Sequence, residues 1–224
     1  MRVPQPYGSK GSLKWVQELI NSCPFVFNKE LSNQLELDLE EIEWLSPLKN
    51  DDYAEYRDDD FLIKLGLEEF KEQLHDFWPK RGPQWDALGK EKEHKKYFLV
   101  EAKANIPELS SILTAYSKRS ISQIRNSLNQ VQDYLNCKPS ICWESGFYQY
   151  ANRIAHLYLL RNLCKVDAFL VFLYFVNDHT RMPTSKLEWE GALKKQKQLL
   201  GLKNHKLQRF VIDIFIDVNK INFR

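Results

Sequence analysis

The sequence predicts an α/β fold in which a mixed central sheet is flanked by helices. The first observation is residues 168–176, an unbroken apolar run with the length and composition of a strand covered on both faces. The second is a pair of strand-like segments, 84–89 and 97–103, which flank a charged stretch and predict a hairpin. The third is that segments with helical periodicity precede, separate and follow these strands, an order typical of a sheet with helices on its faces.

The other elements follow from the spacing of apolar residues and from residues that start or stop helices. Ser12 is expected to cap a short first helix that ends at Pro24, whereas residues 28–60 are acidic and only weakly periodic. A second helix is predicted over 61–78, and Pro79 ends it. Downstream, we expect a helical segment opened by Pro107, helices over 120–135, 146–163 and 187–200, a loop over 136–145 and a strand over 210–217.

Length and composition favour a single domain. The chain has 224 residues, of which 43% are hydrophobic and 13% aromatic, which is enough for one substantial core. Within residues 1–224 we expect a core over 61–176. Residues 1–60 would then form an N-terminal elaboration, and residues 177–224 would add a C-terminal helix and strand.

Charge and cysteine usage set the expected environment. The 32 basic and 30 acidic residues nearly cancel, so net charge does not by itself argue for nucleic acid. The four cysteines form no Cys-x-x-Cys pair and no zinc-type cluster, which favours free thiols in a reducing compartment. The N-terminus has no signal-peptide run, and the longest apolar stretch is about half a membrane span. We therefore expect a soluble, cytoplasmic protein with no membrane partner.

The most informative residues are Asp86 and the tripeptide Glu101-Ala102-Lys103. They lie on the two sides of the charged stretch 90–96, the expected hairpin tip. Side chains two apart on a strand share one face, so Glu101 and Lys103 are expected to lie together. Antiparallel pairing would bring Asp86 beside them, so that two carboxylates and a lysine meet at the end of an apolar strand.

This grouping suits a divalent metal and a phosphodiester. Mg²⁺ prefers oxygen ligands, which Asp86, Glu101 and the backbone carbonyl of Ala102 could provide, with Mn²⁺ as a substitute. Such a cation polarises the phosphoryl group and promotes ionisation of the attacking water. Lys103 could orient the nucleophile or stabilise the developing negative charge.

The structural alternative is a salt bridge on a solvated strand face, since alternating opposite charges are common there and contribute little. The preceding residues favour a site instead. Tyr97-Phe98-Leu99-Val100 is apolar on both faces, and a strand buried on both faces has no structural need for Glu101 and Lys103.

Asp86, fourteen intervening residues and then Glu101-Ala102-Lys103 resemble the signature of the PD-(D/E)XK nuclease superfamily. The resemblance covers roughly residues 61–176 and implies a restriction-endonuclease-like core of helix, three-stranded meander, helix and fourth strand. It also implies metal binding by Asp86 and Glu101 and a catalytic role for Lys103. The family's proline before the aspartate is replaced here by Trp85, and the first meander strand is expected within 80–85.

Some members of the superfamily add further polar residues to the site. A glutamate from the first helix would correspond here to Glu68, Glu69 or Glu72, for which surface exposure is the alternative. A glutamine from the second helix would correspond to Gln149. Gln149, Asn152 and Arg153 are equally compatible with a place in the site and with surface exposure. Asn105, two residues beyond Lys103, is a candidate phosphate contact.

The sequence thus predicts a Mg²⁺-dependent nuclease, with DNA as the favoured nucleic-acid partner. RNA remains open, as do endonucleolytic and exonucleolytic cleavage, and double-strand cleavage by such a fold would imply a homodimer. The alternative function is a catalytically inactive module of the same fold that binds nucleic acid or protein.

Overall fold

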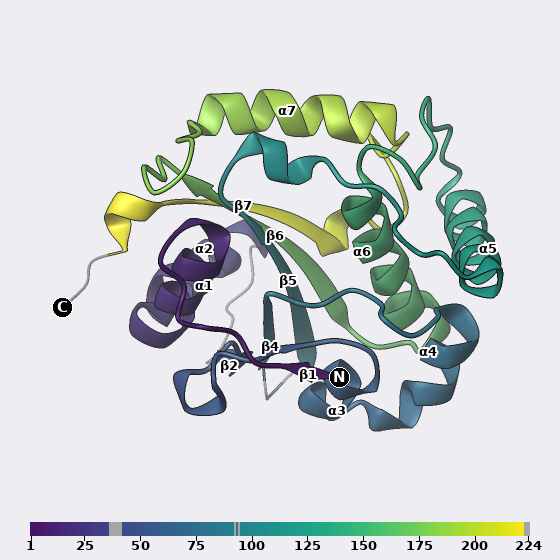
Figure 1. The fold of residues 1–224 in the computed structure, drawn as a ribbon, viewed down its shortest axis with the longest axis horizontal. Coiled ribbons are helices and arrows are strands. Elements are labelled where there is room, and N and C mark those ends of the chain that lie inside the picture. Colours follow the sequence, from purple (N-terminus) through teal and green to yellow (C-terminus); the bar gives the residue numbers. More distant parts are fainter. Residues whose placement is uncertain (36–41, 92, 94, 222–224) are drawn as a thin grey trace.

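The computed structural model describes residues 1–221 except 36–41, 92 and 94. In this part of the chain, helices surround one mixed sheet (Figure 1). The α-helices are α1 (Gly11–Ser22), α2 (Pro24–Leu35), α3 (Asp59–Leu65), α4 (Lys71–Phe77), α5 (Lys118–Leu135), α6 (Tyr148–Tyr158) and α7 (Lys186–Leu199). The strands are β1 (Arg2–Val3), β2 (Ile42–Ser46), β3 (Glu55–Tyr56), β4 (Ala87–Glu91), β5 (Lys96–Lys103), β6 (Ala168–Val176) and β7 (Val211–Asp217).

The central sheet has the strand order β2-β4-β5-β6-β7. Its first three strands are antiparallel, and β5, β6 and β7 run parallel to one another. The prediction of an α/β fold with a mixed sheet flanked by helices is therefore confirmed. The parallel step from β5 to β6 needs a crossover, which α5 and α6 provide (Figure 1).

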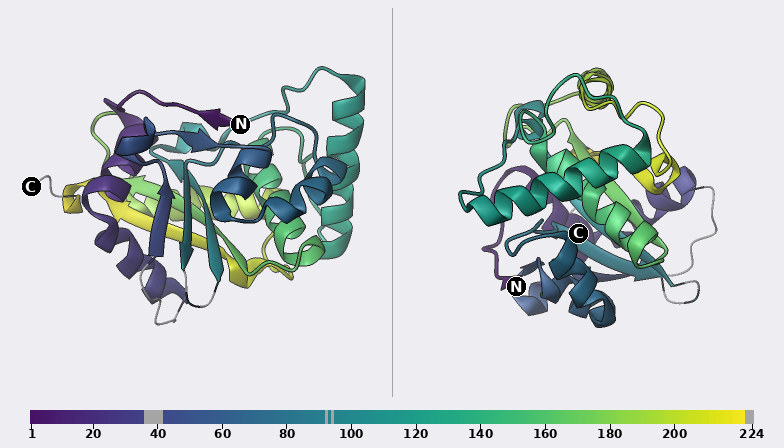
Figure 2. Two further views of the ribbon diagram at one scale, coloured as in Figure 1. Left: turned by 90° about the horizontal axis from the view of Figure 1, so that it is seen from below. Right: turned by 90° about the vertical axis from the view of Figure 1, so that its right-hand side faces the viewer.

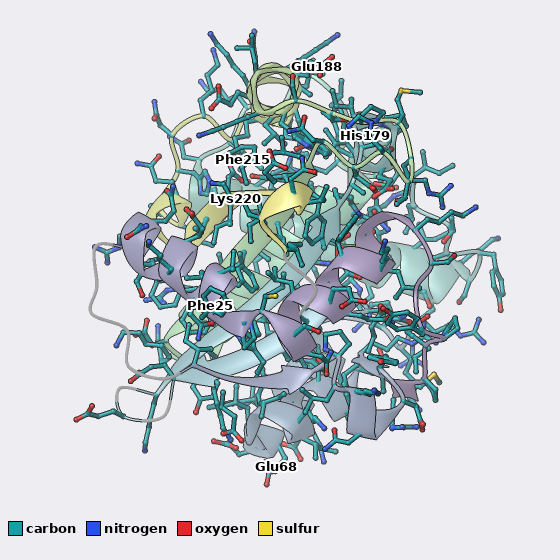
Figure 3. The ribbon with its side chains drawn as sticks, turned by 90° about the vertical axis from the view of Figure 1, so that its left-hand side faces the viewer. Phe25, Glu68, His179, Glu188, Phe215 and Lys220 are labelled. Carbon is teal, nitrogen blue, oxygen red and sulfur yellow. The ribbon has the colours of Figure 1, made fainter. Side chains whose placement is uncertain are left out.

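The two faces of the sheet are covered by different helices. Helices α1 and α2 cover one face, and Figure 3 shows them in front of the sheet. The other face packs against α3, α4, α5, α6 and α7 in the larger of the two hydrophobic clusters. Figure 2 shows these layers from two further sides. Strand β6 runs through the middle and is buried along its whole length, as the sequence predicts.

Strand β5 places its side chains alternately on these two faces. Phe98, Val100 and Ala102 pack with the α1 and α2 cluster, while Leu99 packs with the opposite cluster. The period of two then puts Glu101 and Lys103 on the α6 face. The predicted hairpin is confirmed, because β4 and β5 pair antiparallel with Gly89 opposite Phe98. Residues 92 and 94 of the expected tip lie outside the described residues.

The N-terminal sixty residues contribute to the central sheet, which the sequence did not reveal. The weakly periodic stretch contains most of α2 and, in β2, an edge strand that pairs with β4. Trp44 of β2 stacks on Phe27 of α2 with ring centroids 4.6 Å apart. A Cβ at position 89 would lie 2.8 Å from the Trp44 ring, so Gly89 is required for this close packing.

Two expectations for residues 61–85 are wrong. Residues 80–85 form no strand, apart from a single bridge between Trp85 and Tyr56, so the meander begins with β2. The helix expected over 61–78 is divided into α3 and α4, because Gly66 at φ +75° ends α3. The amides of Gly66 and Leu67 donate back to Ile63 and Leu62, an arrangement that satisfies the last carbonyls of the helix.

Smaller differences concern element ends. Helix α5 begins at Lys118, because the Ser117 side chain caps it, and Pro107 belongs only to a short 3₁₀ turn over Ile106–Leu109. The helix predicted over 146–163 consists of α6 followed by a π-helical turn over Leu159–Leu163. Across the residues that the structure describes, no helix is long and apolar enough to cross a membrane.

Candidate active site

Asp86 and the end of β5 lie together, as the hairpin predicts. The amide of Asp86 donates to the carbonyl of Val100 at 3.1 Å, which continues the β4–β5 ladder by one residue. Because β4 starts only at Ala87, the next amide of β5 that faces it has no strand partner. The Asp86 carboxylate accepts this hydrogen bond from the Ala102 amide at 2.7 Å. The carbonyl of a strand residue points to the same side as its amide, so the Ala102 carbonyl also faces Asp86.

Glu101 is held between two cations. One carboxylate oxygen accepts from Lys103 Nζ, and the other accepts from Arg153 Nε at 2.6 Å. Lys103 also donates to Gln149 Oε1 at 3.1 Å. Gln149 and Arg153 are four residues apart on α6 and so lie on the same helix face. Helix α6 therefore fixes both side chains on this face of β5: Gln149 holds Lys103, and Arg153, one turn later, holds Glu101.

Arg153 joins several segments of the molecule at this point. It is only 4% exposed, and its guanidinium lies 4.9 Å from the centre of the Trp85 ring. It donates to Asn152 Oδ1 at 2.8 Å and to the backbone carbonyl of Gln84 at 2.9 Å. Asn152 and Arg153, for which site and surface were equally compatible with the sequence, are therefore buried parts of the site.

Glu55 is a third carboxylate at the site, and the sequence did not predict it. It lies on the two-residue strand β3, is 6% exposed, and accepts hydrogen bonds from the side chains of Gln84 and Gln5. The bridge between Tyr56 and Trp85 brings this segment next to Asp86. A two-residue strand in an acidic stretch has no periodicity, so no local signal could have identified Glu55.

The three carboxylates and their partners line one cleft of about 830 Å³. Its acidic part contains Glu55, Asp86, Glu101, Lys103, Gln149 and Arg153. The cleft is bordered by residues 78–84 and by residues 111–117, which come from two separate connections. Because both Glu55 and Glu101 are nearly inaccessible, we define this acidic part as the floor of the cleft.

The charges on the floor shift one another's ionisation. Burial raises the pKa of Asp86 well above its ordinary value, and the nearby charges of Glu101 and Glu55 raise it further. Burial also raises the pKa of Glu55, to about 7. Burial alone would raise the pKa of Glu101, but Arg153 and Lys103 outweigh it, and that pKa is lowered. Burial opposes ionisation of Lys103, yet Glu101 and Asp86 raise its pKa, so its ammonium form is favoured.

The donor set of the floor fits a hard divalent cation. The carboxylates of Glu55, Asp86 and Glu101 and the Ala102 carbonyl are the oxygen ligands that Mg²⁺ prefers. Burial is the main cause of the raised pKa values of Asp86 and Glu55, and the charge of Glu101 raises both further. A bound cation would favour the ionised form of these carboxylates.

The present side-chain positions are those of a site closed by internal ion pairs. Among the residues that the structure describes, no three acidic, histidine or cysteine side chains are positioned to hold a metal ion. Both oxygens of Glu101 are taken by Lys103 and Arg153. Coordination through Glu101 therefore requires its carboxylate to share or exchange these partners.

The remaining sequence candidates lie elsewhere. Glu68, Glu69 and Glu72 are exposed and do not line the cleft, and Figure 3 shows Glu68 at the outer edge of the molecule. These three glutamates lie after the break between α3 and α4, and they are surface residues and not parts of the site. Asn105 is buried, but its amide donates to Glu108 Oε1 at 2.7 Å, outside the cleft.

No family model, no curated protein and no solved structure matches this chain, so its geometry and the sequence motif are what bear on the assignment.

Proposed function

We propose that this protein is a metal-dependent nuclease of the PD-(D/E)XK type that hydrolyses phosphodiester bonds in DNA. The observation that carries the proposal is the floor of the cleft, where Asp86, Glu101 and Lys103 meet at the end of β5. The order of the sheet supports it, because an antiparallel β2-β4-β5 meander is followed by a crossover to the parallel strand β6. A restriction-endonuclease-like core implies the same meander and parallel fourth strand, although here α3 and α4 lie between β2 and β4 instead of before the meander.

Asp86, Glu101 and the Ala102 carbonyl would hold Mg²⁺, and Glu55 adds a further carboxylate beside them. When bound, this ion would polarise the phosphodiester and promote ionisation of the attacking water. Arg153 binds the Glu101 carboxylate from the α6 side and so holds it in a defined orientation.

Lys103 would act as a cation. Its pKa is raised by Glu101 and Asp86, so it keeps its proton at neutral pH and is unsuited to remove one from water. Its hydrogen bond to Gln149 leaves the ammonium group with donor capacity, since a lysine has three protons to donate. It can therefore orient the attacking water or stabilise negative charge that develops on the phosphate.

A binding module without activity is the second candidate function. The observation that favours it is that both oxygens of the central carboxylate, Glu101, already accept hydrogen bonds, one from Lys103 and one from Arg153. Such a module would still bind nucleic acid through the cleft. The two functions differ in whether cleavage depends on the carboxylates.

The test is cleavage of single-stranded and double-stranded DNA by the purified protein with Mg²⁺ or Mn²⁺. We expect Asp86→Asn and Lys103→Ala each to lower the cleavage rate by at least about 100-fold, since each removes a charged group that acts on the reacting atoms. Glu72→Gln is the matched control, because it makes the same carboxylate-to-amide change on an exposed helix outside the cleft.

Cleavage that survives Asp86→Asn and Lys103→Ala unchanged would contradict the proposal. Binding of DNA without any cleavage by the unaltered protein would select the second function.

A further inference from the structure

The cleft has two borders of different chemistry above its acidic floor. One is residues 111–117, the connection that runs from the end of β5 towards α5 (Figure 1). This border is anchored at its start: Ser111 donates through its amide to Gly146 O at 2.7 Å, and Leu113 donates to Glu144 O at 2.8 Å. The residues that follow are therefore presented from a fixed base.

Two large side chains on this border are exposed. Tyr116 is 87% exposed and Ile112 is 63% exposed, although both line the same cleft as the carboxylates. In the part of the chain that the structure describes, Tyr116 stacks on no other ring and makes no hydrogen bond. An unpartnered aromatic side chain beside a polar floor is available to stack on a flat ligand, and nucleobases stack on aromatic side chains whatever their sequence.

The other border, residues 78–84, is basic. Lys80 and Arg81 are exposed, and neither forms an ion pair with any residue that the structure describes. Their loop is held by Pro79 and Pro83 on either side and by the Gly82 amide, which donates to Asp58 Oδ1 at 2.9 Å. Two unpaired cations on one border and an exposed aromatic ring on the other match the phosphates and bases of one nucleic-acid strand.

Depth and size favour a single strand over a duplex. Two of the carboxylates, Glu55 and Glu101, are buried at the floor and only 6% and 3% exposed, so a scissile phosphate has to enter between the borders to reach them. A cleft of 830 Å³ lies in the range of small-ligand pockets, about 300–1,000 Å³. It accommodates a few nucleotides of one strand, whereas duplex recognition uses extended surfaces of about 1,000–2,500 Å².

We propose that the cleft selects single-stranded DNA, by stacking of a base on Tyr116 and by phosphate contacts from Lys80 and Arg81. The inference rests on the proposed nuclease function only in that the floor is taken to be where the bound strand is cleaved. Recognition itself depends only on the two borders.

The experiment is fluorescence anisotropy with a labelled oligothymidylate and with a duplex of equal length. It is done with Ca²⁺ in place of Mg²⁺ so that binding is measured without turnover. We expect tighter binding of the single strand. Tyr116→Ala should weaken that binding by about 5- to 100-fold, because loss of one stacked base is worth this much, whereas Tyr116→Phe should preserve it.

Phe25→Ala is the matched aromatic control. Phe25 is 70% exposed on α2, does not line the cleft, and is visible in Figure 3, so its loss should leave binding unchanged. Replacing Lys80 or Arg81 with Gln should weaken binding. The slope of log K against log salt concentration should also become shallower, by about 0.7 per lost phosphate contact.

Equal or tighter binding of the duplex, or a Tyr116→Ala variant that binds like the unaltered protein, would overturn the inference. The proposed nuclease function fails separately: Tyr116-dependent binding without any Mg²⁺-dependent cleavage would retain single-strand recognition and exclude catalysis. Cleavage that requires Asp86, together with binding that is unchanged in Tyr116→Ala, would retain catalysis and exclude single-strand recognition by Tyr116.

Discussion

The two faces of the central sheet differ sharply in what they bury. The face under α1 and α2 is mostly apolar: β5 contributes Phe98, Val100 and Ala102, and β6 contributes Val171 and Leu173. A charged pair of Lys96 and the buried Glu91 lies on this face at the start of β5. The face towards α6 begins with apolar residues as well. At the end of β5 it changes to a charged network, in which Glu101 meets Lys103 and Arg153. Adjacent residues of one strand therefore serve two different environments.

The charged face is expected to be the less stabilising of the two. Burying an ion pair costs desolvation that its attraction often fails to recover, so apolar residues of similar size are frequently as good or better. Around the end of β5, the α1 and α2 face is packed with apolar residues such as Val100, Ala102 and Leu173. Packing of this part of the sheet therefore does not by itself require the charges of Glu101, Lys103 and Arg153.

Glu101→Ala should cause the largest loss of stability on the charged face. It leaves Lys103 and Arg153 as buried cations without their carboxylate, which should lower the free energy of unfolding by about 3–5 kcal/mol. Leu173→Ala on the apolar face should cost about 2–5 kcal/mol through a cavity. Urea denaturation measures both.

A second substitution separates the two mechanisms. Adding Arg153→Met to Glu101→Ala should restore part of the stability, because it removes an unpaired buried cation. Adding the same change to Leu173→Ala should lower stability further. Simple additivity of Arg153→Met in both backgrounds would contradict a charge network specific to one face.

The pH dependence of stability should show a smaller difference between the faces. The pKa of Glu55 is raised from 4.5 to about 7 in the folded protein, and that of Asp86 is raised as well. Between these pH values the folded state keeps protons that the unfolded chain loses. The free energy of unfolding should therefore fall as the pH rises from about 4.5 to about 7.

Glu55→Gln should make this decline shallower, since it removes one of the groups responsible. Leu173→Ala is the control from the α1 and α2 face and should shift the whole curve without changing its slope, because this change removes no titrating group. Chemical denaturation at pH 5 and pH 7.5 is sufficient. A decline equally steep in Glu55→Gln would show that Glu55 is not buried as described.

The sequence predicted those parts of the fold that have a strong local signal. Strand β6 is apolar along its length, and the charged stretch between 84–89 and 97–103 marks the hairpin, so both were identifiable. Strand β2 was not, because its neighbours are acidic and its pairing with β4 depends on Gly89 making room for Trp44. The break at Gly66 depends on a left-handed residue that helical periodicity ignores.

The site shows the same limit. Asp86, Glu101 and Lys103 were placed correctly because strand alternation and hairpin pairing are local rules. Gln149 and Arg153 reach them from α6 through tertiary packing, and only their polarity in an apolar helix pointed to them. Glu55 arrives through a single bridge between Tyr56 and Trp85, a contact that no pattern in the chain encodes.

Calorimetric titration of Mn²⁺ into the protein at pH 6 and pH 8 tests directly whether the charged face holds a metal site. Metal ligands must lose their protons, and the pKa values of Asp86 and Glu55 are raised. We therefore expect binding that is tighter at pH 8 and releases protons at pH 6. Asp86→Asn should abolish it, and Leu173→Ala should leave it intact. No binding at either pH, or binding that persists in Asp86→Asn, would contradict a metal site at Asp86.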